Sequence, residues 1–206
     1  EVLLTKMRLF DQVIARRADY FIAGSENARK RIWKVYRKEA KVVYPFVDPE
    51  RFKNIESFNG GYFAVAGRSS GYKRFDLAKE ACKKLGLPLK VISGGLSDEM
   101  VVRILAGCKG LIVPGIEDFG LVSLEAQALG KPVVAYGAGG ALETVIANKT
   151  GIFFSEQTEE GLMNALRRLD FSNIDPQDCK KNALKFSKEN FNKNFKQTAA
   201  SLLYTN

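Results

Sequence analysis

The 206-residue chain contains no histidine, and it has only three cysteines and one tryptophan. Without histidine, neither an imidazole acid–base catalyst nor a histidine-ligated metal can form within this chain. The cysteines, Cys82, Cys108 and Cys179, are widely separated and odd in number, so they do not fit a paired metal or disulfide framework. They favour buried structural thiols in a reducing compartment, and the predicted location is the cytoplasm.

Long apolar runs are also missing from the sequence. No run approaches the roughly 20 residues needed to span a bilayer, and no signal peptide is visible. The apolar content of 46% is nevertheless ordinary for a globular protein. The length suits one domain with an appendage, or two small domains.

Negative charge is in the minority, since 23 acidic residues face 32 basic ones. The net charge of +9 indicates affinity for anions such as phosphates, acidic lipid or nucleic acid. In residues 29–41, Trp33 and Tyr36 are interleaved with basic residues, so contact with an anionic membrane at its inner surface is one interpretation. A solvated helix face is the simpler alternative. No RNA-binding signature accompanies these residues, and no nucleic-acid partner is expected.

Apolar runs and helical periodicities alternate along most of the chain. The runs predict strands at residues 20–23, 41–44, 62–66, 89–93, 111–114, 132–135 and 151–154, and the runs at 62–66, 111–114 and 132–135 are typical of buried strands. Helical spacing follows most of them, and Ser25 and Ser97 are expected to cap helices that begin directly after them. This alternation is typical of a doubly wound, mostly parallel sheet of the Rossmann-like α/β class.

Residues 110–145 carry the densest pattern of polar groups between predicted strands. Glu117 falls in the loop at the carboxyl end of a strand, where open α/β sheets bind ligands. Glu125 follows eight residues later, about two turns along the next helix. Between them, the amides around residues 119–122 open that helix and suit an anion. A ligand that combines hydroxyl groups with phosphate, such as a nucleotide sugar, would use all three features.

The run EDFGLVSLEA, followed by GKPVVAYGAGGALE, resembles the donor-binding domain of retaining GT-B glycosyltransferases. It is most similar to the large family of mannosyl- and glucosyltransferases that carries an E-x7-E motif. The resemblance implies that Glu117 is the catalytic residue, which orients the sugar through its hydroxyls, and that Glu125 binds the ribose. It further implies that the donor diphosphate is held by Arg68 and Lys73, together with the amides of Phe119, Gly120, Leu121 and Val122.

The reaction implied by the resemblance is sugar transfer from a nucleotide-diphosphate sugar, with retention. No metal or other cofactor is expected, and the absence of a D-x-D motif agrees with this. The YPFVD and DFGLVSLEA runs resemble mannosyltransferases of polysaccharide biosynthesis, which favours GDP-mannose as donor and a saccharide or lipid-linked acceptor.

The resemblance also divides the chain. Residues 1–40 would be the end of an N-terminal, acceptor-side domain or a linker, residues 41–188 the nucleotide-sugar domain, and residues 189–206 a tail helix. Relatives insert a helix and a strand where this chain passes directly from residue 94 to residue 97. We therefore expect the sheet to lack one edge strand. Because residues 1–40 would be only the end of the N-terminal domain, we also expect the chain to be a fragment of a longer enzyme and to be inactive alone.

Several alternatives remain open at this point. Glu117 could cap a loop and Glu125 could pair with Lys131, while Arg68 and Lys73 could belong to a surface loop in which Ser69 or Ser70 makes a turn. The glycine run 137–140 could approach a ligand or form a tight turn. The apolar stripe of the last helix is interpreted as core packing. The chain could also be a non-catalytic nucleotide-binding or interaction module. A nicotinamide oxidoreductase ranks far lower, because no G-x-G-x-x-G follows the first strand.

Overall fold

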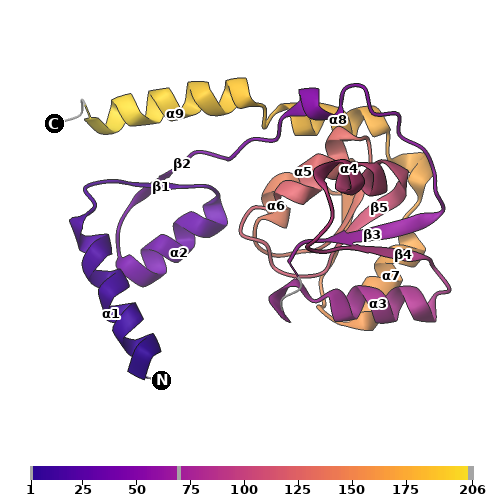
Figure 1. Ribbon diagram of the computed structural model, residues 1–206, viewed down its shortest axis with the longest axis horizontal. Helices are drawn as coiled ribbons and strands as arrows, with labels where there is room; N and C mark the ends of the chain where they lie inside the picture. Colours follow the sequence, from indigo (N-terminus) through magenta and orange to yellow (C-terminus); the bar gives the residue numbers. More distant parts are fainter. Residues whose placement is uncertain (1, 69–70, 204–206) are drawn as a thin grey trace.

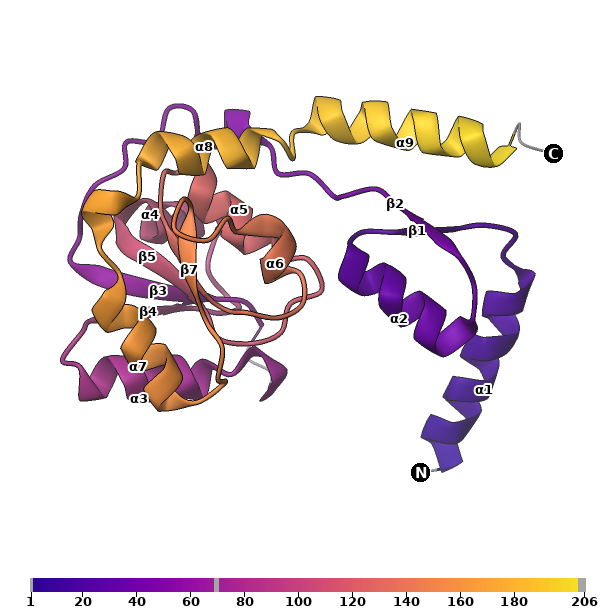
Figure 2. The ribbon, with the colours of Figure 1, turned by 180° about the vertical axis from the view of Figure 1, so that it is seen from behind.

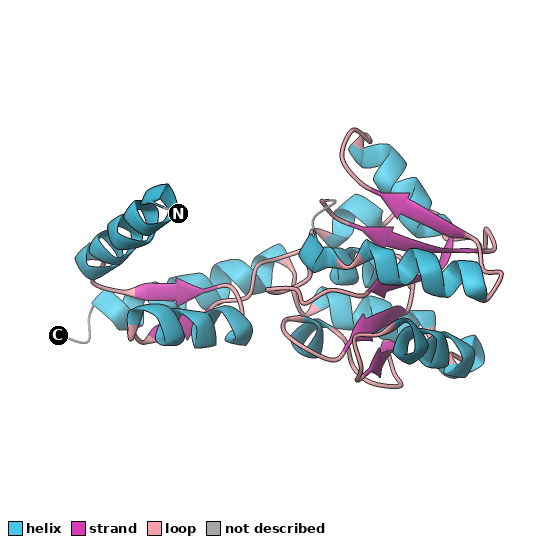
Figure 3. Ribbon diagram, turned by 90° about the horizontal axis from the view of Figure 1, so that it is seen from below, coloured by secondary structure: helices cyan, strands magenta, loops and turns pink. Residues whose placement is uncertain are grey.

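The computed structural model describes residues 2–68 and 71–203. Ser69 and Ser70, one of which makes a turn in the alternative interpretation of this loop, lie outside the described residues. Figure 1 shows a sheet domain with helices around it and a smaller N-terminal unit beside it. In Figure 3 the sheet domain lies at one end of the molecule, and the helix α1 and both chain termini lie at the other.

The sheet domain is built on five strands that all run parallel. Their order is β4-β3-β5-β6-β7. The strands are β3 (Tyr62–Ala66), β4 (Leu89–Ile92), β5 (Cys108–Val113), β6 (Val133–Tyr136) and β7 (Gly151–Phe154). Every residue of β3 is buried, as expected for a strand with helices on both faces. The predicted doubly wound α/β sheet is confirmed.

The missing edge strand is confirmed as well. β4 is the last strand on its side of the sheet, and the chain passes from it directly to α4. In a six-stranded doubly wound sheet of order 3-2-1-4-5-6, strand 3 lies at that edge. Its absence leaves the pairings of β3 with β4 and with β5 intact.

Helices cover both faces of the sheet. One buried apolar cluster joins the sheet to α4 and α5, and a second cluster joins it to α3 and α7. The helices of the domain are α3 (Phe75–Lys84), α4 (Asp98–Gly107), α5 (Leu121–Ala128), α6 (Ala141–Thr144), α7 (Glu159–Arg168) and α8 (Pro176–Leu184). Short 3-10 helices lie at η1 (Pro49–Phe52), η2 (Gly71–Lys73) and η3 (Phe171–Asn173).

The N-terminal unit contains two helices and two strands. They are α1 (Val2–Arg17), β1 (Phe21–Ala23), α2 (Glu26–Tyr36) and β2 (Ala40–Val42). β1 and β2 form a parallel two-stranded sheet of their own. The strand predicted at residues 20–23 is present as β1, and β2 is its partner. Ser25 caps α2 as predicted, since its hydroxyl accepts a hydrogen bond from the Ala28 amide.

The tail helix α9 (Lys188–Leu203) corrects one prediction. Its stripe of Phe191, Phe195 and Leu202 was interpreted as core packing, but no residue of α9 is buried. The helix continues past the sheet domain and extends along the N-terminal unit (Figure 2). Its Phe191 ring contacts Phe46, with the ring centroids 5.3 Å apart. Among the described residues, no helix combines the length and apolarity that a membrane span requires.

Candidate functional site

A cavity of about 880 Å³ lies at the carboxyl ends of β3, β4 and β5. The ends of β3 and β4 contribute Ala66 and Ile92, and residues 116–122 with Glu125 form the wall on the β5 side. Side chains of α2, from the N-terminal unit, complete the lining. This is the edge at which open parallel α/β sheets bind ligands.

The loop that carries Glu117 is supported by the glycine run after β6. The Gly140 amide donates a hydrogen bond of 2.7 Å to the Glu117 carbonyl. A Cβ atom on Gly140 would lie 2.3 Å from the Phe119 Cα atom, so only glycine permits this approach. Residues 137–140 do not line the cavity. Their close approach is to the Glu117 loop of the same chain, which holds that loop in place.

Lys73 and Glu117 form an ion pair inside the cavity, although they are 44 residues apart. The Lys73 Nζ atom lies 2.6 Å from Oε1 and 2.5 Å from Oε2 of Glu117. The two side chains are only 14% and 12% exposed. The contact depends on Gly115, because a Cβ atom there would lie 2.3 Å from the Tyr72 carbonyl oxygen and push η2 away.

The N-terminus of α5 opens onto the same cavity. Gly120 precedes the helix with φ +96 and provides no side-chain cap, and Gly120, Leu121 and Val122 all line the cavity. Phe119 also lines it, while its buried ring packs against Tyr44 and Phe186 at centroid distances of 5.4 and 5.5 Å. The first amides of a helix carry partial positive charge, so this end of the cavity suits an anion.

Glu125 lines the cavity from the second turn of α5. The alternative pairing with Lys131 does not occur: the Lys131 ammonium instead donates a 2.8 Å hydrogen bond to the Phe58 carbonyl. Arg51, which the sequence had not singled out, lies 3.6 Å from the Glu125 carboxylate. Burial raises the pKa of Glu125, Arg51 acts to lower it, and Asp98 raises it further.

Arg68 is a predicted site residue that does not line the cavity. It follows β3, its side chain is exposed, and it is absent from the cavity lining. The cavity therefore brings together Lys73, both glutamates and the amides of residues 119–122, and Arg68 lies outside it. Within residues 2–68 and 71–203, no group of three or more carboxylates and thiols could hold a metal ion. Metal independence stays a prediction.

Sequence reasoning did not find two residues of α2 that line the cavity, Asn27 and Arg31. The Nδ2 atom of the Asn27 side chain lies 3.4 Å from both the Glu117 carbonyl oxygen and the Asp118 carboxylate. Arg31 forms an ion pair with Asp118. The capping signal of Ser25 showed where α2 begins. Nothing in the local pattern indicated which loop the helix contacts, because that depends on how the two units pack.

Comparison with known proteins gives a family for most of the chain. Residues 50–186 match the family model described as Glycosyl transferases group 1. The chain is 34% identical over 114 residues to an alpha-1,3/1,6-mannosyltransferase of Dictyostelium discoideum, covering 54% of this chain and 26% of that protein. It is 25% identical over 188 residues to an uncharacterized glycosyltransferase of Methanocaldococcus jannaschii, covering 80% of this chain and 53% of that protein. The chain thus spans at most about half the length of these relatives.

Solved structures agree with the fold at low sequence identity. The sucrose-phosphate synthase of Thermosynechococcus elongatus superposes with a TM-score of 0.81 at 16% identity, over 98% of this chain and 63% of that one. The HepE protein of Anabaena, solved in complex with UDP and glucose, superposes with a TM-score of 0.74 at 19% identity, over 96% of this chain and 67% of that one. The sheet domain has the architecture of the C-terminal domain of GT-B glycosyltransferases. The chain belongs to the Glycosyl transferases group 1 family.

Proposed function

We propose that this chain is the donor-binding portion of a retaining glycosyltransferase that uses a nucleoside-diphosphate sugar. The observation that carries the proposal is the convergence of Lys73, Glu117, Glu125 and the N-terminus of α5 on one cavity at the carboxyl edge of the sheet. Cations and helix amides suit a diphosphate, and carboxylates suit the hydroxyl groups of a sugar and a ribose. A nucleoside-diphosphate sugar presents all of these groups.

In this proposal the charges of the cavity act on the departing diphosphate. Negative charge grows on that group as the sugar takes on oxocarbenium-ion character. Lys73 and the amides of residues 120–122 would stabilise it. Glu117 would hold the sugar hydroxyls and orient the ring, and Glu125 would accept hydrogen bonds from the ribose. Arg68 is proposed as a second phosphate ligand that must swing in from outside the cavity, because its side chain is exposed.

For the identity of the donor we propose GDP-mannose. The Dictyostelium relative is a mannosyltransferase by name, whereas the HepE structure holds UDP and glucose, so UDP-glucose is the natural competitor in a binding test. For the acceptor we propose a saccharide or a lipid-linked saccharide in polysaccharide biosynthesis. A cytoplasmic location, with the basic α2 against the inner surface of a membrane, would suit a lipid-linked acceptor. Trp33 on α2 is 48% exposed, so its ring could contact such a surface.

A second candidate is a nucleotide-binding module without transferase activity. The direct passage from β4 to α4 favours it, because the segment that is inserted there in relatives is absent. Both candidates require that the cavity binds a nucleoside diphosphate. They differ in whether sugar is transferred when an acceptor is supplied.

Calorimetric titration of this chain with GDP-mannose, UDP-glucose and NAD⁺ tests the proposal. We expect the two sugar nucleotides to bind and NAD⁺ not to bind. In a thermal unfolding measurement, a bound ligand at 100 times its Kd should raise the free energy of unfolding by about 2.7 kcal/mol. Lys73→Met should weaken binding at least about tenfold, whereas Lys79→Met, an exposed charge change on α3, should not. Tight binding of NAD⁺ with no response to either sugar nucleotide would refute the proposal.

A further inference from the structure

Arg51 lies between two carboxylates from different helices. One terminal nitrogen of its guanidinium is 3.2 Å from the Asp98 carboxylate, and the other is 3.6 Å from Oε1 of Glu125. Arg51 belongs to η1, Asp98 is the first residue of α4, and Glu125 lies on α5. One side chain therefore connects three elements beside the cavity.

The Glu125 carboxylate needs such a partner because it is largely withdrawn from water. Its side chain is 25% exposed, and burial is the main cause of its raised pKa. Two lysines and one amide side chain near Glu125 have other partners. Lys131 bonds to the Phe58 carbonyl and Lys185 to Asn182, and the Gln127 amide bonds to Thr144 and Asn182. Lys180 of α8 lies beside Gly130. Among the described residues, Arg51 is the cation paired with Glu125.

The geometry of the pair leaves part of the carboxylate for a ligand. Arg51 contacts Oε1, so Oε2 can accept a hydrogen bond from a hydroxyl group in the cavity. Arg51 itself lines an adjoining hollow of about 400 Å³, together with Asp98. The pair thus stands at the boundary between the two spaces. A planar guanidinium held by Asp98 fixes the direction from which Glu125 is approached.

We infer that Arg51 is a positioning residue: it holds Glu125 oriented and charged to accept hydrogen bonds from the vicinal hydroxyls of a ribose, and so makes the cavity selective for ribonucleotides. The inference rests on the proposed function, since it takes a nucleoside diphosphate as the ligand. Asp98 completes the arrangement by holding the other side of the guanidinium.

The first test compares UDP and GDP with their 2′,3′-dideoxy counterparts in calorimetric titrations. We expect the unsubstituted chain to prefer each ribonucleotide at least about tenfold, because hydrogen bonds to a charged carboxylate are strong. Arg51→Met should reduce this preference to about threefold or less, and Arg51→Lys should retain part of it. Lys53→Met removes an exposed positive charge two residues away and should keep the full preference. Comparing ratios cancels the general effect of a lost charge on phosphate binding.

The second test follows the same preference as a function of pH. The preference should vanish as the pH falls through the pKa of Glu125, because a protonated carboxyl group is a poorer acceptor. Arg51 lowers that pKa and Asp98 raises it. The midpoint should therefore move to higher pH in Arg51→Met and to lower pH in Asp98→Asn. If Arg51 and Asp98 had a merely structural role, the two substitutions would not move the pH midpoint in opposite directions.

The outcomes separate the inference from the proposed function. If the unsubstituted chain prefers ribonucleotides and Arg51→Met keeps both the preference and the pH midpoint, the inference is overturned and the proposed function stands. If the unsubstituted chain binds no nucleoside diphosphate, both are overturned. Should Arg51→Met fail to fold, Arg51→Lys and Asp98→Asn decide: a preference and a midpoint that neither of them changes overturn the inference.

Discussion

At the scale of single residues, the chemistry of the cavity is dominated by the ion pair of Lys73 and Glu117. The resemblance gives these residues separate roles, one toward phosphate and one toward sugar. In the structure each is the other's partner, and both are nearly buried. A phosphate that binds at Lys73 would therefore lie beside a carboxylate that opposes it. Binding of a phosphate at Lys73 must therefore weaken the ion pair between Lys73 and Glu117.

Replacing Glu117 with glutamine should strengthen the binding of inorganic pyrophosphate and UDP. The substitution removes a negative charge close to the bound phosphate, where two like charges 4 Å apart repel by about 1 kcal/mol in water and more in a partly buried site. We expect an increase in affinity of about tenfold by calorimetry. Glu160→Gln, an exposed change on α7, is the matched control. Weaker pyrophosphate binding in Glu117→Gln would contradict this account of the pair.

At the scale of elements, α2 is the part of the N-terminal unit that completes the cavity. Two side chains accept hydrogen bonds from three backbone amides of its first turn. Ser25 accepts from the Ala28 amide, and the Glu143 carboxylate accepts from the Glu26 and Asn27 amides at 2.7 and 3.0 Å. Because Glu143 belongs to α6, a helix of the N-terminal unit is capped by a residue of the sheet domain. This places Asn27 and Arg31 at the cavity.

Replacing Glu143 with glutamine should loosen this contact. The change removes a negative charge at the positive end of α2, where capping contacts are typically worth about 1 kcal/mol. We expect a lower thermal midpoint and faster hydrogen exchange at the Glu26 and Asn27 amides. The pKa of Tyr44 gives an independent readout: it is raised first by burial and then by Glu143, so it should fall in the variant. Unchanged exchange and an unchanged Tyr44 titration would show that Glu143 does not hold α2.

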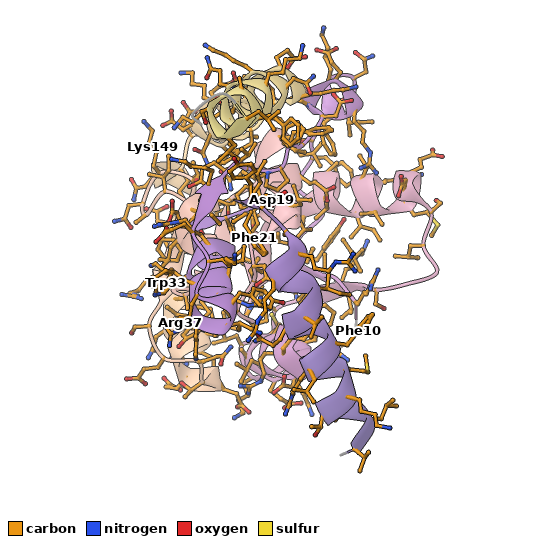
Figure 4. The ribbon with its side chains drawn as sticks, turned by 90° about the vertical axis from the view of Figure 1, so that its left-hand side faces the viewer. Phe10, Asp19, Phe21, Trp33, Arg37 and Lys149 are labelled. Atoms are coloured by element: carbon orange, nitrogen blue, oxygen red, sulfur yellow. The ribbon has the colours of Figure 1, made fainter. Side chains whose placement is uncertain are left out.

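At the scale of the whole molecule, the helix α1 exposes apolar surface at one end of the structure. Of the residues of α1, only Ala15 is buried. Figure 4 views the molecule from the side of the N-terminal unit, with Phe10 on α1 and Trp33 on α2. The large apolar side chains of α1 that are at least half exposed are Val2, Leu3, Leu4, Met7, Leu9, Phe10, Val13 and Ile14. Exposed apolar side chains in this number are typical of interaction sites or of surfaces that aggregate.

We therefore expect this chain, purified alone, to associate with itself at rising concentration. Sedimentation velocity over a hundredfold range of concentration should show an increasing weight-average mass. The double substitution Phe10→Lys and Ile14→Lys should abolish the increase, because it places charge on the exposed face of α1. Lys6→Glu on the same helix, which changes charge without removing apolar surface, serves as the control. A constant monomer mass for the unsubstituted chain would contradict the expectation.

The strands and helix starts could be predicted from local pattern. The runs at residues 62–66 and 151–154 coincide with β3 and β7, and Ser25 and Ser97 cap helices as expected. These features depend on residues within a few positions of one another, so the sequence alone contains their cause. The helix α8 was not foreseen, and the stripe of α9 was assigned to the core although none of its residues is buried.

The missing edge strand was predicted from the resemblance to the family, whereas the sequence by itself determined the parallel sheet and the position of the Glu117 loop at the carboxyl ends of the strands. Strand direction and connection order fix these features, and both are set by periodicity and chain length. Only the tertiary structure decided that Lys73 pairs with Glu117, that Arg51 pairs with Glu125, and that Arg68 lies outside the cavity. An ion pair depends on separations of a few ångströms between distant segments, and the packing of loops against glycines and helices sets those separations.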